Sequence, residues 1–137
     1  MRAVGYWVAT GLVAAELGVG GVWDLARLSF VRDVVAHLGY PSYFLLLLGG
    51  WKVAGAVVLL VPGWPLLKEW AYAGAFFVYT GAIVSHLVSA YGPGEVVVLS
   101  GLAALTVLSW ALRPASRRLR PPRSAGTGGV VRVGRRV

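Results

Sequence analysis

The sequence predicts an all-α fold, an integral membrane antiparallel four-helix bundle with a short interfacial helix between its first two long helices. Three observations predict it. The chain is 58% hydrophobic and only 13% charged, roughly half the charged fraction of soluble domains. Four apolar runs of membrane-spanning length follow one another along the chain. Prolines and glycines separate the runs, where turns are expected.

The four runs and their connections form one expected domain, residues 1–113. The expected membrane helices span, in chain order, residues 4–23, 43–62, 70–90 and 95–112. A signal peptide is the competing interpretation of the first run. That run is too long for the apolar region of a signal peptide, and it contains an acidic residue, Glu16.

The segment between the first two runs, about residues 25–38, differs in kind. Its apolar residues recur at helical spacing and charged or polar residues fall between them. Gly39 and Pro41 then end the pattern. This is typical of a short amphipathic helix lying at the membrane interface.

Charge is unevenly distributed. The net charge is +8, and eight arginines lie from Arg113 onward, so the five basic and five acidic residues before it balance. We expect residues 114–137, rich in Arg, Pro and Gly, to form a disordered basic tail. Because it directly follows a membrane helix, anionic lipid headgroups are its expected partners, and nucleic acid is not. The predicted headgroup contacts are Arg113, Arg117, Arg118, Arg120 and Arg123.

Four crossings place both termini on one side of the membrane. Arg2, Lys68 and the tail arginines share that side, whereas Arg27 and Arg32 on the other side are offset by acidic residues. The positive-inside rule therefore predicts cytoplasmic termini.

The most unusual residue is Lys52, in the middle of the second apolar run. An ammonium group at mid-membrane costs at least ~2.5 kcal/mol. Glu16, on the neighbouring antiparallel helix, falls at nearly the same depth, and we predict that the two side chains pair. Such a pair could fix the register of the two helices without chemistry, or it could form a proton or substrate site. The absence of any pairing is the third alternative.

A second candidate site lies on the third long helix. Tyr72, Tyr79 and His86 are seven residues apart and share one helix face. They could line a cavity or form a hydrogen-bonded relay. Alternatively, the tyrosines could serve only for packing, beside one histidine whose hydrogen bonds are satisfied. Asp24 falls at a depth from which it could orient His86. The candidate intramembrane polar site therefore comprises Glu16, Lys52, Tyr79, His86 and Asp24.

Several classes of chemistry are disfavoured. The chain has no cysteine, which excludes disulfides, thiolate catalysis and Cys-ligated metals. His86 has no second ligand at helical spacing, so no metal site is predicted. No catalytic motif is recognisable, and an enzyme is not the favoured interpretation.

Short stretches spread over residues 6–119 resemble the DoxX-like family of small four-helix bacterial membrane proteins. They are Tyr6-Trp7 with Thr10, Gly20-Gly21 with Asp24-Leu25, Leu38-Gly39-Tyr40-Pro41 with Tyr43-Phe44, Leu48-Gly49 with Trp51-Lys52, Leu67 to Gly74, Ser85-His86, and Ser109 to Pro114. The resemblance implies an inner-membrane protein. The family pattern also has an acidic residue a few positions after Ser-His, whereas the next acid here is Glu95.

The wider DoxX group has been linked to thiosulfate:quinone oxidoreduction and to membrane complexes that handle redox stress. The resemblance therefore implies a small membrane protein that is a subunit or partner of a redox or stress complex. One alternative is a quinone- or lipid-binding oxidoreductase component, with quinone as its cofactor. A second is a small transporter or proton path through Glu16 and Lys52.

Overall fold

The computed structural model describes residues 1–120 of the 137-residue chain, and this part is all-helical, as predicted. The elements are α1 (Arg2–Leu25), α2 (Ser29–His37), α3 (Phe44–Leu60), α4 (Pro65–Val88), α5 (Pro93–Leu112) and a short 3₁₀ turn, η1 (Ala115–Arg117). Helices α1, α4 and α5 are long and apolar enough to cross a membrane, and α3 is a shorter apolar helix of 17 residues.

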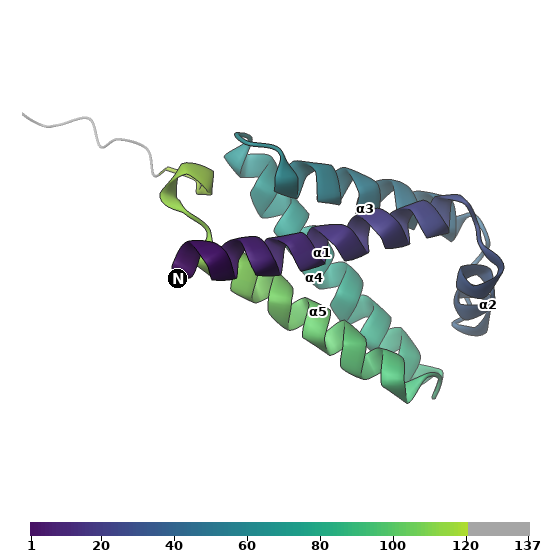
Figure 1. The fold of residues 1–137 in the computed structure, drawn as a ribbon. Helices are drawn as coiled ribbons and strands as arrows, with labels where there is room; N and C mark the ends of the chain where they lie inside the picture. Colours follow the sequence, from purple (N-terminus) through teal and green to yellow (C-terminus); the bar gives the residue numbers. More distant parts are fainter. Residues whose placement is uncertain (121–137) are drawn as a thin grey trace, which may run out of the picture.

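The four long helices pack as two pairs. Helix α1 lies along α3, α4 lies along α5, and α1 also contacts α5. In Figure 1 the two pairs diverge toward the end of the molecule at which α2 lies. The N-terminus and η1 lie at the opposite end. The divergence creates the space in which the candidate site is built.

The core sits where all four long helices meet. Its buried side chains are Val13, Leu17, Ala56, Leu59, Tyr72, Ala75, Tyr79 and Ala103. Many large apolar side chains face outward instead, among them Val88 and Val97, which are 82% and 72% exposed. An apolar exterior of this extent is expected where the neighbouring molecules are lipids or other proteins rather than water.

Two helix boundaries differ from those expected. Helix α3 ends at Leu60, because Val61 precedes Pro62 and takes an extended conformation. Helix α4 begins at Pro65 rather than at residue 70. Proline is favoured in the first turn of a helix. The segment before residue 70 is therefore part of the helix, and Lys68 within it is fully buried inside the bundle.

The amphipathic segment and the tail also differ in extent. Helix α1 continues through Asp24 to Leu25, so α2 is shorter than predicted and begins at Ser29. The predicted disordered tail starts with an ordered turn, η1, which Arg117 ties to the end of α3 through the carbonyl of Leu59. The rest of the predicted tail, residues 121–137, lies outside the described part of the chain.

Candidate functional site

A pocket of about 730 Å³ lies between the diverging helix pairs, beneath α2. Its walls are mostly apolar, and a few polar side chains are set among them. The polar lining residues are Glu16, Asp24, Tyr40, Lys52, Ser85, His86 and Glu95. Apolar walls with few convergent polar groups are typical of sites for small molecules.

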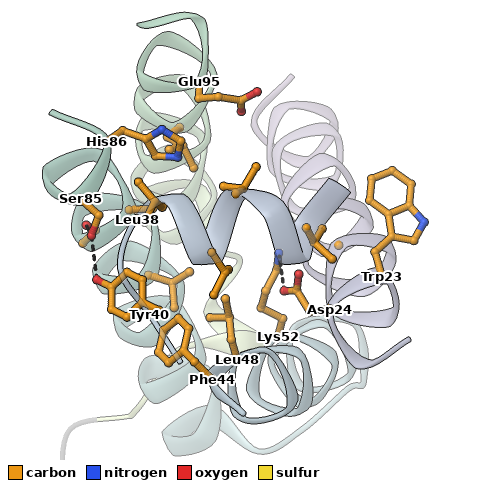
Figure 2. A pocket seen from close by; sticks show the side chains of 18 of the residues that line it. Trp23, Asp24, Leu38, Tyr40, Phe44, Leu48, Lys52, Ser85, His86 and Glu95 are labelled. Atoms are coloured by element: carbon orange, nitrogen blue, oxygen red, sulfur yellow. Dashed lines mark hydrogen bonds and ion pairs between the residues drawn. The ribbon is translucent and has the colours of Figure 1, made fainter. Parts of the chain in front are cut away.

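An ion-paired cluster forms one wall of this pocket. Lys52 Nζ lies 3.0 Å from Glu16 Oε1, so the pairing predicted from their equal depth is confirmed. The same ammonium lies 3.5 Å from Asp24 Oδ2, as Figure 2 shows. The Tyr79 hydroxyl donates a hydrogen bond to Glu16 Oε2. One lysine is therefore shared by two carboxylates, and Tyr79 holds one of them.

Glycines let Lys52 approach α1. Glu16, Gly20 and Asp24 follow at intervals of four residues, so they lie on one face of the helix. A Cβ atom on Gly20 would lie 2.6 Å from Lys52 Nζ and 2.9 Å from Glu16 Oε1. Gly21 and Gly49 allow the two backbones to cross, since a Cβ on Gly49 would lie 2.7 Å from the Gly21 carbonyl oxygen. Gly20 thus leaves the space in which the ammonium lies beside the carboxylates.

Helix α2 covers the pocket with its apolar face. Phe30, Val31, Val34, Val35 and Leu38 all line the cavity. The amphipathic pattern seen in the sequence therefore serves this cavity, whatever contact α2 makes with a membrane surface.

The segment around α2 is joined to the α4–α5 pair by two contacts. The Tyr40 hydroxyl and the Ser85 hydroxyl are 2.7 Å apart and hydrogen-bonded. The His37 ring stacks on Tyr91, with ring centroids 4.1 Å apart. These contacts are at or near the surface, so they can break without opening the core.

The expected link between Asp24 and His86 is wrong. Asp24 faces Lys52, and His86 Nδ1 lies 2.9 Å from the Tyr91 carbonyl oxygen. His86 does line the pocket, and so does Glu95, the acid that the sequence places farther along than the family pattern does. A turn through Gly92, at a φ of +60°, connects α4 to α5 and brings Glu95 back toward the histidine. Sequence spacing alone did not reveal Glu95.

The Tyr72, Tyr79 and His86 stripe is buried, but its members have separate partners. The Tyr72 hydroxyl bonds to Ser109 at 2.8 Å, and Ser109 bonds to Thr10 at 2.7 Å. Tyr79 bonds to Glu16. No hydrogen bond joins these groups to one another in residues 1–120, so the stripe does not form the relay that the spacing allowed.

A profile of the DoxX-like family matches residues 8–112. The chain belongs to this family. No curated protein and no solved structure matches the chain. Family membership, together with three helices able to span a bilayer, indicates a small membrane protein.

At the opposite end of this DoxX-like protein, the first predicted lipid contact is wrong. Arg113 is only 5% exposed, lies 2.7 Å from Glu69, and stacks over the ring of Tyr72. It is held inside the protein because Glu69, which belongs to α4, faces it. Arg113 is therefore a structural cation.

The other tail arginines differ in their availability. Arg117 donates to the carbonyls of Leu59 and Leu60, and Arg118 to that of Arg113. Arg118 and Arg120 are exposed, so their predicted contact with lipid headgroups stays open. Arg123 lies outside the described residues.

Sequence inspection also missed Lys68. Its ammonium donates to the carbonyls of Val58, Leu59 and Val61, at the C-terminal end of α3. These carbonyls have no partner within their own helix. The signal was present, since a lysine in the first turn after a Pro-Gly-Trp-Pro linker lies close to the end of the preceding helix.

Proposed function

We propose that this protein crosses the bacterial inner membrane four times and binds an amphiphilic small molecule in the pocket beneath α2. The observation that carries the proposal is the pocket itself, about 730 Å³ with apolar walls and the Glu16–Lys52–Asp24 cluster on one side. Such walls suit an apolar body, and the cluster suits a compact polar head. Quinones and lipids both have this form.

The route to the pocket supports a ligand that comes from the membrane. A second cavity of about 430 Å³ lies between α3 and α4, and its lining is almost wholly apolar. Phe44, Leu48, Lys52 and Val78 line both cavities. An apolar tail could therefore lie between the two helices while the head reaches Lys52.

The proposed topology puts the pocket in the outer half of the membrane. Lys68, Arg113 and η1 gather at the end that holds the N-terminus, where positive-inside asymmetry favours the cytoplasm. Since the chain has no cysteine, a single introduced cysteine is the only thiol, and its labelling reports the side of the membrane on which it lies. Ser29→Cys should react with a membrane-impermeant maleimide on intact spheroplasts, and Ser116→Cys should react only after lysis. The reverse pattern would invert the topology.

Pocket binding is tested by filling the cavity. Gly81 lines it, and a Cβ there meets nothing within 4 Å, so Gly81→Phe should occupy the space without disturbing packing. Gly101 on α5 is equally open and lines neither cavity, so Gly101→Phe is the matched control. Mass spectrometry of detergent-purified protein should show amphiphiles that Gly81→Phe loses and Gly101→Phe retains. Identical contents in both variants and the wild type would reject the pocket.

We propose a membrane redox or stress complex as the setting of this protein, and the bound amphiphile would be a component that the protein shares with its partners in the complex.

A proton path through Glu16 and Lys52 has less support. On the side toward the N-terminus the cluster meets the apolar core of Val13, Leu17 and Leu59. No hydrogen bond in residues 1–120 connects it across this core to Thr10 and Ser109.

A further inference from the structure

We propose that the pocket selects ligands whose polar head carries a positive charge. This rests on the proposed amphiphile binding and names the ligand class. The first support is the charge balance of the lining. Among the described residues that line the pocket, three are carboxylates, Glu16, Asp24 and Glu95, and Lys52 is the only lysine or arginine. The wall carries an excess of negative charge.

The second support is the weak pairing of Asp24. Asp24 is only 5% exposed, and its Oδ2 accepts no hydrogen bond from the described residues. The nearest cation, Lys52, stands 3.5 Å away and donates instead to Glu16, at 3.0 Å. Buried carboxylates are normally paired and hydrogen-bonded, because burial of an unmatched charge is costly. One ammonium therefore serves two carboxylates, and the Glu16–Lys52–Asp24 cluster keeps a net negative charge in the wall of the cavity.

The same arrangement disfavours an anionic head. Lys52 already serves two carboxylates, so an incoming anion would compete with both of them for one ammonium. It would also be placed beside the negative groups, and like charges repel. A neutral quinone carbonyl would find Lys52 already engaged and could not satisfy Asp24, because it has no donor.

The apolar part of the lining fits a cationic head as well. Trp23, Phe30, Tyr40, Phe44 and Phe77 all border the cavity. Aromatic faces attract cations through the ring quadrupole, also where the rings are partly exposed, as Trp23, Phe30 and Phe77 are here. Aromatic walls around a carboxylate excess favour a bulky lipophilic cation, such as a quaternary ammonium or phosphonium compound.

Two probes of similar size and shape but opposite charge test the proposal: tetraphenylphosphonium and tetraphenylborate. Binding is measured by equilibrium dialysis of the full-length protein in a neutral detergent, and the wild type is compared with variants to cancel partition into micelles. The wild type should bind the phosphonium, and Asp24→Asn should weaken this by at least about tenfold, as expected for loss of a desolvated charge partner. Asp33→Asn, the same change on α2 outside the pocket lining, should leave the affinity unaltered.

The outcomes separate this inference from the proposed function. If Gly81→Phe abolishes binding of decylubiquinone or tetraphenylborate while the phosphonium fails to bind, the pocket stands and the charge selection is wrong. Equal binding of both ions, unaffected by Asp24→Asn, would also overturn it and would indicate that Asp24 is neutralised by a proton. Should Asp24→Asn fail to fold, Glu95→Gln at the exposed rim takes its place and should weaken phosphonium binding by a smaller factor.

Discussion

The two ends of this molecule handle buried charge in different ways. At the end that holds the N-terminus, the ammonium of Lys68 caps three carbonyls of α3, and Arg113 is closed against Glu69 and Tyr72. At the α2 end, Lys52 is shared by Glu16 and Asp24 beside an open cavity. The first arrangement pairs its cations with groups of the fold, and these cations line neither cavity. The second lies in the wall of a cavity and has one ammonium for two carboxylates, which is why we propose a structural role for one end and binding for the other.

The largest expected effect concerns Lys68. Lys68→Met should lower the free energy of unfolding by about 3 kcal/mol or more, because three carbonyls at the end of α3 lose a charged donor in a buried site. Denaturation by SDS from a neutral detergent, followed by circular dichroism, measures this. Ligand binding by the molecules that remain folded should be unaltered, since Lys68 lines neither cavity.

Lys68→Arg is the matched control, because it keeps the charge and the donors, and it should lose less than Lys68→Met. A Lys68→Met protein as stable as the wild type would mean that this lysine does not cap α3, and the contrast between the two ends would fail.

Lys52→Met should cost a similar amount, about 3 kcal/mol, because it leaves Glu16 and Asp24 without their cation. Glu16→Leu alone should also destabilise, through the loss of Lys52 and Tyr79 contacts. The double variant should recover part of the stability, since two of the three charges are then gone. A double-mutant cycle in the same SDS assay gives the coupling energy.

Full recovery in the double variant, with unaltered ligand binding, would show that the pair only joins α1 to α3. Strictly additive losses would show that Glu16 and Lys52 do not interact, contrary to their 3.0 Å separation.

The sequence was sufficient for the helices and for the Glu16–Lys52 pair, because both depend on depth along an apolar helix. It was not sufficient for Asp24, whose partner depends on how far α1 extends past the membrane run. It also missed Lys68 and Arg113, because a charge near a helix end is normally solvated. Their burial follows from the packing of α4 against its neighbours, which no spacing within one helix encodes.

A smaller effect is expected at Gly20. Gly20→Ala should cost roughly 1–2 kcal/mol, because the new Cβ would displace Lys52 Nζ, only 2.6 Å away, from between its carboxylates. Gly11→Ala on the same helix is the control, since nothing lies within 4 Å of its Cβ, and it should be neutral or stabilising. Thermal unfolding of the two variants side by side checks this. If Gly20→Ala and Gly11→Ala are equally stable, the Lys52 ammonium does not lie against position 20.

The smallest effect on stability is expected at Tyr40. Tyr40→Phe removes one surface hydrogen bond, to Ser85, and should cost no more than about 1 kcal/mol. If α2 covers the pocket as a separable element, amide exchange in Ser29–His37 should nonetheless accelerate, while exchange in α3 stays constant. Hydrogen–deuterium exchange with mass spectrometry resolves the two segments. Thr80→Val, which loses only the hydroxyl's bonds within α4 to the Phe76 and Phe77 carbonyls, controls for the loss of a hydroxyl. Equal acceleration of amide exchange in α2 and α3 would mean that the two helices open together. Helix α2 would then not be a separable cover of the pocket.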